Sequence, residues 1–194
     1  MQGEAEDADH ARARLPRRHM LRLLLAASLT TLPGVAQAAR WRPPREWRLR
    51  LYNTATGEDF DDVYCVNGRI VPEAMARIDW LLRDHYCDQC ISIDDSLVHR
   101  LYELQCRLDG DRPFEVLSGY RTPETNSQLI ARGLRAAPKS LHMEGRAIDI
   151  RLPGVKAKTL YRAALASGEG GSGWYPRRGF VHVDSGPPRQ WVGR

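Results

Sequence analysis

Alternating apolar and polar side chains along the chain predict a set of short strands. Residues 48–53 alternate strictly, and residues 62–66 form a second apolar stretch that ends at Asn67-Gly68, a pair typical of turns. Three further strands are predicted at residues 114–117, 147–152 and 180–184. In the last two of these, apolar and polar side chains alternate, so the period of two that a strand imposes places them on opposite faces.

Apolar residues at helical spacing predict helices between these strands. Residues 72–82 open with a proline and carry an apolar face, and residues 94–108 repeat this pattern after an acidic start. A third helix is predicted from Thr122 to about Leu134, because threonine is a good cap and the following proline has no unpaired N–H to lose. Residues 155–167 predict a fourth. The sequence therefore predicts an α+β fold, with a small antiparallel sheet flanked by helices.

The first forty residues follow a different pattern. A basic segment at residues 17–22 leads into the apolar run 23–29, and small residues follow at 36–38. This order is typical of a signal peptide, since a spanning helix needs about 20 apolar residues. The paired arginines resemble a twin-arginine signal, while an ordinary secretory signal and an uncleaved anchor remain alternatives. We expect a leader at 1–38, a linker at 39–46 and a single domain at 47–194.

Composition narrows the class of partner. The chain has 194 residues, of which 42% are hydrophobic, enough for one ordinary globular domain. The formal net charge is +5, and the expected leader contributes only five arginines against four acidic residues. No basic tract is interleaved with aromatic residues, so nucleic-acid binding is not expected. A mildly cationic surface would instead suit an anionic polymer of the cell envelope.

Four cysteines add a second constraint. Cys65, Cys87, Cys90 and Cys106 would, in an exported protein, pair as disulfides more readily than remain free thiols. A structural zinc site that includes His85 is an alternative, and a redox pair is another. The redox alternative lacks the βαβ context that a thioredoxin-like site requires.

The candidate chemistry lies in two histidines and one aspartate. His142 and Asp149 are separated by six residues, and His182 lies in the last predicted strand. If the last two predicted strands are antiparallel neighbours, Asp149 and His182 project from one face with Cβ atoms about 4.5–5.5 Å apart. His142 must fold back to join them, and Gly145 permits the turn. Two imidazoles and a carboxylate form the ligand set of a catalytic zinc site, which keeps one position open.

Three segments carry a resemblance to a known family. They are Ser-Gly-Tyr-Arg at 118–121, Lys-Ser-Leu-His-Met-Glu-Gly-Arg-Ala-Ile-Asp-Ile at 139–150, and Phe-Val-His-Val-Asp at 180–184. These segments resemble the zinc peptidases that include bacterial D-Ala-D-Ala carboxypeptidases, lysostaphin-type enzymes and the hedgehog signalling domain. They are most similar to the murein endopeptidase K branch, over roughly residues 60–191.

The resemblance implies a role for each matching residue. It implies His142, Asp149 and His182 as zinc ligands, and Arg121 as the group that holds a substrate carboxylate. A guanidinium fork matches a carboxylate in planar geometry, although Arg121 could instead pair with a nearby acid or cap the following helix.

The general base is the point where the sequence departs from its relatives. Several relatives carry an acidic residue three positions before the last zinc histidine, or a histidine two before it. Here these positions are Gly179 and Phe180. Asp184 is the candidate base, because it shares a strand face with the last histidine. An equal alternative is that Asp184 accepts a hydrogen bond from a histidine ring. Glu144 is a weaker candidate base.

Together these features predict a zinc-dependent peptidoglycan hydrolase that cleaves peptide cross-links. The expected substrate is the peptidoglycan stem peptide, and the expected location is the periplasm or another exported part of the envelope. We expect a monomer with no stable membrane insertion once the leader is removed. A D-Ala-type carboxypeptidase and a non-catalytic envelope-binding module with the same fold are the alternatives.

Overall fold

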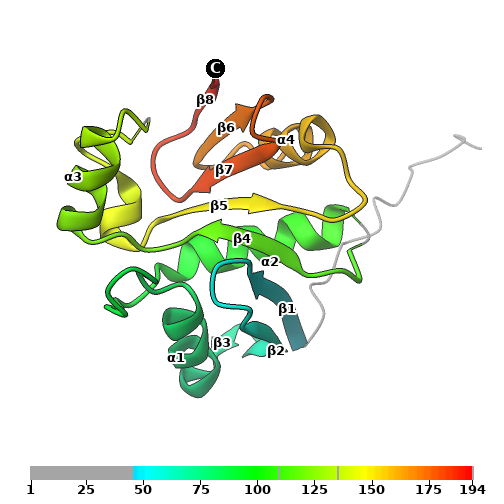
Figure 1. Cartoon of the computed structure of the whole chain (residues 1–194). Helices are drawn as coiled ribbons and strands as arrows, with labels where there is room; N and C mark the ends of the chain where they lie inside the picture. The colour runs from blue at the N-terminus through cyan, green and yellow to red at the C-terminus, as the bar shows by residue number, and fades with distance from the viewer. Residues whose placement is uncertain (1–45, 109, 135, 194) are drawn as a thin grey trace, which may run out of the picture. The chain divides into compact units, whose positions relative to one another are not determined.

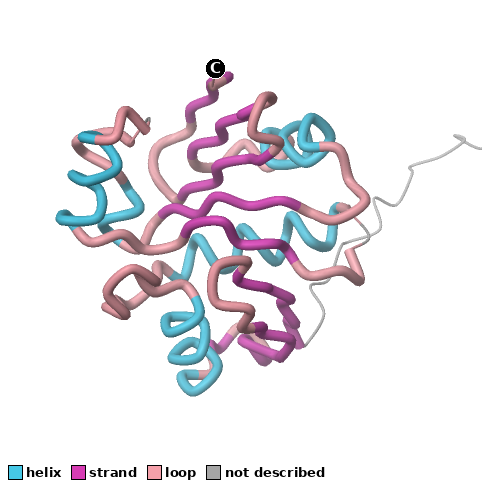
Figure 2. Tube along the Cα trace, viewed as in Figure 1, coloured by secondary structure: helices cyan, strands magenta, loops and turns pink. Residues whose placement is uncertain are grey.

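The computed structural model describes residues 46–108, 110–134 and 136–193, and all of them lie within one compact unit, Pro43–Arg194. The predicted leader and nearly all of the predicted linker fall outside the described residues, so both stay predictions. Figure 2 shows the strands of this unit together in its middle and the helical segments around them. Among the described residues, no helix combines the length and the apolar character needed to cross a membrane.

The described strands form one mixed sheet in the order β3-β2-β1-β4-β5-β7-β6-β8 (Figure 1). The strands are β1 (Glu46–Asn53), β2 (Asp59–Val66), β3 (Arg69–Ile70), β4 (Phe114–Ser118), β5 (Ala147–Arg151), β6 (Gly171–Tyr175), β7 (Phe180–Asp184) and β8 (Arg189–Val192). Neighbouring strands are antiparallel, except that β1 is parallel to β4 and β6 is parallel to β8.

Helices cover the sheet and border its ends. They are α1 (Pro72–Leu81), α2 (Asp95–Arg107), α3 (Pro123–Ala131), α4 (Ala157–Leu165) and the short 3-10 helix η1 (Leu141–Glu144). Helix α2 contacts β1, α4 contacts β6 and β7, and the two helices contact each other (Figure 1). The predicted start of α3 is confirmed, since the Thr122 side chain accepts a hydrogen bond from the Thr125 amide at 3.1 Å.

The two faces of β5 and β7 have different environments. Ile148 and Ile150 of β5, with Val181 and Val183 of β7, are fully buried in the hydrophobic core, which also contains apolar residues of α2 and α4. The intervening residues project from the opposite face. The predicted antiparallel pairing of these strands is confirmed, with Asp149 directly opposite His182.

The α+β class is confirmed, but the sheet is larger than the small antiparallel one that we expected. The N-terminal hairpin of β1 and β2 continues the sheet, because β1 lies parallel to β4. At the other side, β6 and β8 extend it. The sequence pattern missed these last two strands, since Gly171–Tyr175 contains two glycines and Arg189–Val192 follows two prolines. The four strands that carry the site, β4, β5, β7 and β6, are antiparallel throughout.

The cysteines differ from expectation. All four are free thiols, so the disulfides expected from the sequence are not formed. Cys65 is buried in the core on β2, whereas Cys87, Cys90 and Cys106 are exposed. Cys65 therefore differs from the other three in its access to solvent. Within the described residues, the one group of side chains placed to hold a metal ion contains no cysteine. The alternative structural zinc site at His85 therefore has no support in the structure either.

Candidate metal centre

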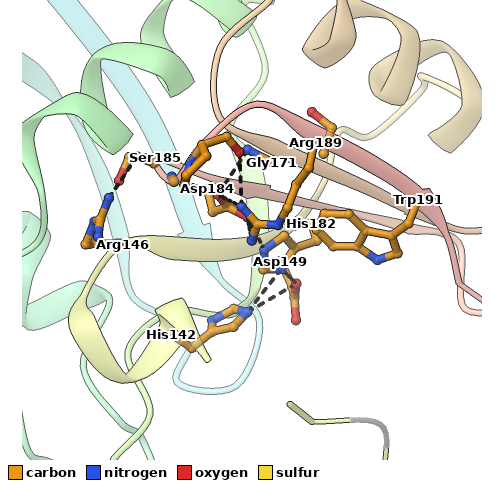
Figure 3. Close-up of polar contacts among 12 residues, drawn as sticks. His142, Arg146, Asp149, Gly171, His182, Asp184, Ser185, Arg189 and Trp191 are labelled. Atoms are coloured by element: carbon orange, nitrogen blue, oxygen red, sulfur yellow. Dashed lines mark hydrogen bonds and ion pairs between the residues drawn. The ribbon is translucent and has the colours of Figure 1, made fainter. Parts of the chain in front are cut away.

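Three buried side chains from η1, β5 and β7 converge on one point: His142, Asp149 and His182 (Figure 3). His142 Nε2 lies 3.3 Å from His182 Nδ1 and 3.5 Å from Asp149 Oδ1. His182 Nδ1 lies 2.9 Å from the same aspartate oxygen. The structure thus brings together the three ligands that the sequence predicted, although they are far apart along the chain.

The separations between these atoms fit a zinc ion. Ligands about 2.0–2.2 Å from zinc at tetrahedral angles lie about 3.3–3.6 Å from one another. The three observed separations are 2.9, 3.3 and 3.5 Å, so small side-chain adjustments suffice. Imidazole nitrogen and carboxylate oxygen are donors that zinc accepts, and three protein ligands leave the fourth position open.

The local backbone explains how His142 reaches the sheet. Helix η1 ends at Gly145, whose φ of +67° is a left-handed conformation that glycine adopts without a steric penalty. A Cβ at Gly145 would also lie 2.8 Å from the carbonyl oxygen of Ser92, so the position requires glycine on two grounds. His142 Nδ1 donates to the Gly119 carbonyl at 2.7 Å. Because Nδ1 carries the proton, Nε2 keeps a lone pair for a metal.

Asp184 fixes the other histidine. Its Oδ2 atom lies 3.0 Å from His182 Nε2, and the residue is fully buried. Arg189 donates to both carboxylate oxygens, at 3.0 and 2.7 Å, and the amides of Gly171 and Gly186 donate to Oδ1 at 3.0 and 2.8 Å. A carboxylate held this firmly orients the ring, so that Nε2 carries the proton and Nδ1 is available to a metal.

These contacts favour the second of the two roles predicted for Asp184. A general base must reach the water that attacks the substrate, whereas Asp184 bonds to the ring nitrogen on the far side of His182 from Asp149 and exposes no surface. The hydrogen-bond partner interpretation agrees with both facts. The weaker candidate, Glu144, is exposed, pairs with Arg146 at 3.2 Å and is not one of the residues that line the groove.

Replacing Asp184 with asparagine tests this role. Asp184→Asn keeps the shape of the side chain but removes its charge, which lowers the basicity of the His182 ring. We expect the affinity for zinc to fall about 10–100-fold, as such partners of metal ligands usually contribute. Asp111→Asn, at a fully exposed position, is the control. Competition with a chromogenic chelator measures the affinity, and equal affinities in the two variants would refute the role.

Arg121 contacts the centre directly. Its Nε donates to Ser118 Oγ at 2.7 Å and its Nη2 donates to Asp149 Oδ2 at 2.8 Å. The Asp149 carboxylate therefore has one oxygen toward the histidines and the other against the guanidinium. This ion pair is one of the alternatives predicted for Arg121 from the sequence. The predicted contact with a substrate carboxylate is a separate role, which the ion pair does not exclude.

The electrostatics favour the protonation states that a metal needs at His142 and at the carboxylates of Asp149 and Asp184. Burial lowers the pKa of His142, which keeps its ring neutral. Burial alone would raise the pKa of Asp149, but the two adjacent imidazoles hold it well below its ordinary value. The pKa of Asp184 is also held below its usual range, because hydrogen bonds from His182 and from the Gly186 amide outweigh burial. Burial opposes protonation of His182, and its hydrogen bonds to both carboxylates nevertheless raise its pKa. Both carboxylates are therefore ionised at neutral pH.

The centre lies in a groove of about 490 Å³. Arg121 and the three proposed metal ligands line it, whereas Asp184 and Glu144 do not. The charged side chains of the groove are Asp84, Arg121, Lys139, Asp149, Arg178 and Arg189. Cations outnumber acidic groups four to two in this set, and a bound divalent ion would add further positive charge. A groove of this kind attracts anionic ligands.

Among the groove residues that the sequence analysis did not single out, Tyr175, Arg189 and Trp191 contribute to the candidate site. Arg189 binds Asp184, Trp191 packs beside His182, and Tyr175 accepts a hydrogen bond from Trp191. Arg189 and Trp191 lie on the missed strand β8. Closely spaced glycines at 171 and 173 are the one signal in the sequence, because a glycine within a strand often marks a close approach by a neighbouring group.

Known proteins are similar to this chain over most of its length. A family model described as "Peptidoglycan L,D-endopeptidase MepK" matches residues 42–191. The Escherichia coli K12 protein called peptidoglycan L,D-endopeptidase MepK is 36% identical over 167 residues, which cover 86% of this chain and 90% of that protein. A Haemophilus influenzae protein called probable peptidoglycan L,D-endopeptidase MepK is 31% identical over 170 residues, or 87% of this chain and 91% of that protein.

Proposed function

This chain belongs to the peptidoglycan L,D-endopeptidase MepK family, and we propose that it is a zinc-dependent hydrolase of peptide cross-links in peptidoglycan. The single observation that carries the zinc dependence is the convergence of His142, Asp149 and His182 beside the groove. The proposed scissile bond joins an L-configured residue to a D-configured residue, as the names of the relatives indicate. The proposed location is the cell envelope, where this polymer lies.

The chain's own residues prepare the site for hydrolysis. When bound, zinc would polarise the scissile carbonyl and activate water. His142 and His182 are held in single tautomers by the Gly119 carbonyl and by Asp184, so both lone pairs face one point. Arg121 holds the second oxygen of Asp149, which fixes the plane of that carboxylate. Little rearrangement is therefore needed before the reaction.

The charges of the groove suit an acidic peptide. Stem peptides of peptidoglycan carry free carboxylates, and the groove presents four cationic side chains against two acids. Among these cations, Arg121 forms an ion pair with a proposed metal ligand, Asp149. We assign to Arg121 the role of binding the carboxylate of the substrate residue at the scissile bond. Only its Nε and Nη2 have partners among the described residues, so further N–H groups are available.

Digestion of purified sacculi tests the proposed function. Zinc-loaded protein is incubated with sacculi, and the products are separated as muropeptides. Loss of cross-linked dimers is the expected result. Shortening of monomers without loss of dimers would instead indicate a carboxypeptidase, and unchanged muropeptides would indicate a non-catalytic binding module.

Arg121→Lys tests the assignment of the substrate carboxylate. Lysine keeps the charge but loses the planar pair of donors, so we expect kcat/KM to fall about 10–100-fold, since a hydrogen bond to a charged group contributes about 1.5–3 kcal/mol. The loss should disappear with a substrate whose carboxylate is amidated. Arg162→Lys, on the exposed side of α4, is the control. An equal loss on both substrates would assign Arg121 to Asp149 alone.

A further inference from the structure

Two aromatic side chains beside the metal centre are joined by a hydrogen bond. The indole Nε1 of Trp191 lies 3.1 Å from the hydroxyl oxygen of Tyr175, and both side chains line the groove. An indole N–H can only donate, so the phenol oxygen accepts. The Tyr175 hydroxyl therefore keeps its own proton for another acceptor. Within the part of the chain that the structure describes, no side chain or carbonyl accepts it.

The position of this pair is built into the sheet. Gly173 lies opposite His182 on one side and opposite Trp191 on the other. A Cβ at Gly173 would lie 2.3 Å from the indole, so only glycine leaves room for Trp191 at this position. The ring centroid of Trp191 lies 5.2 Å from that of His182 (Figure 3). This arrangement places the indole ring of Trp191 beside a proposed metal ligand.

Tyr175 is held from two sides. Its ring stacks on Phe180 with 4.4 Å between centroids and 13° between planes. A Cβ at Gly193 would lie 2.3 Å from the tyrosine ring, so the backbone at Gly193 also packs against it. Tyr175 lies opposite Phe180, which shares a strand face with His182 two residues away, or roughly 7 Å along the strand. The phenol therefore stands on the face of the sheet that carries the metal centre, with its ring immobilised.

The start of β7 offers no acidic or histidine side chain at the positions where several relatives carry a base or polarising group. Gly179 has no side chain and lies in the turn, with φ +68°, and Phe180 is apolar and buried. Asp184 is occupied by His182 and Arg189. Of the groove residues on β6 and β7 near His182, Tyr175 alone offers an unshared O–H among the described residues.

We propose that the Tyr175 hydroxyl donates a hydrogen bond to the oxyanion that forms on the scissile carbonyl, and that Trp191 positions this hydroxyl. The inference rests on the proposed peptidase function. As the water oxygen bonds to the carbonyl carbon, the electron pair of the C=O π bond moves to the carbonyl oxygen. The Tyr175 hydroxyl donates a hydrogen bond to this oxygen and keeps its proton. When the C–N bond breaks, that pair returns to the carbonyl, and the leaving amine gains the proton that the water lost.

The role predicts a specific pattern in variants. Tyr175→Phe removes only the hydroxyl, and removal of one oxyanion donor lowers kcat by about 100–1,000-fold. KM, zinc affinity and melting temperature should stay close to wild type, because the ring stack and the three metal ligands are unchanged. Trp191→Phe should lower kcat about tenfold, since it removes the N–H that holds the hydroxyl. Tyr161→Phe is the matched control, because Tyr161 also stacks on an aromatic ring, that of Trp174.

Affinity for a transition-state analogue separates this role from a structural one. A phosphinate peptide carries the charge of the oxyanion, and calorimetry on zinc-loaded protein compares it with an uncleaved peptide of the same sequence. Tyr175→Phe should weaken the phosphinate by the same factor as kcat and leave the uncleaved peptide unaffected. Equal phosphinate affinities, or a kcat within threefold of wild type, would overturn the inference. If the wild-type protein cleaves no cross-linked peptide, the proposed function fails. The role of Tyr175 is overturned separately if wild type and Tyr175→Phe bind the phosphinate equally, or if neither binds it detectably.

Discussion

His142→Ala is expected to reduce hydrolysis of cross-linked peptides to the uncatalysed background. The imidazole is almost fully buried, bonds to the Gly119 carbonyl through Nδ1 and directs Nε2 at Asp149 and His182. Its removal leaves two ligands, too few for a tetrahedral site with one open position. The affinity for zinc should therefore fall by more than the 10–100-fold that partners of ligands contribute.

The measurement combines metal analysis after dialysis with peptide hydrolysis. His85→Ala is the matched control, because His85 lines the same groove without belonging to the converging group. We expect this control to keep one equivalent of zinc and most of its activity. A folded His142→Ala protein that retains zinc and cleaves at the wild-type rate would remove His142 from the site.

Arg100→Leu is expected to lower the free energy of unfolding by about 3–5 kcal/mol, because it leaves several buried acceptors unsatisfied at about 1–3 kcal/mol each. Arg100 lies on α2 and is 4% exposed. Its side chain extends to the backbone of β6 and β7, the strands next to the site. Its guanidinium donates to the carbonyls of Asp184, Gly171 and Ala164 and to Ser172 Oγ. Leucine has similar helix propensity but leaves all four acceptors without this partner.

Urea denaturation of the metal-free protein measures this effect without a contribution from zinc binding. Arg107→Leu is the control on the same helix, since Arg107 is exposed and a surface change of this kind usually stays within about 0.5 kcal/mol. Because Arg100 holds the backbone of Asp184, the variant should also bind zinc more weakly. Equal unfolding free energies for the two variants would show that the buried guanidinium does not stabilise the fold.

The sequence predicted the candidate metal centre because strand periodicity is strict. Once β5 and β7 are taken as antiparallel neighbours, the alternation of side chains allows Asp149 and His182 to meet on the polar face, and the register confirms that they do. The return of His142 was also predictable, since Gly145 permits a turn that other residues resist.

The remaining parts of the site depend on contacts that leave no periodic signal. Which nitrogen of His182 would face a metal ion follows from its bond to Asp184, and this bond could not be distinguished in advance from a catalytic role for the same carboxylate. Trp191 reaches the groove through the parallel pairing of β8 with β6, a long-range contact. The parallel pair of β1 and β4 joins segments still further apart along the chain, so the full width of the sheet could not be predicted from alternation within single strands.

The central claim is that three side chains bind one zinc ion at the groove, and anomalous X-ray diffraction from crystals of the zinc-loaded protein tests it most directly. Data collected on the two sides of the zinc absorption edge should show one strong anomalous peak, about 2.0–2.2 Å from His142 Nε2, Asp149 Oδ1 and His182 Nδ1. A peak at the exposed cysteines with none in the groove, or no zinc peak at all, would contradict the account.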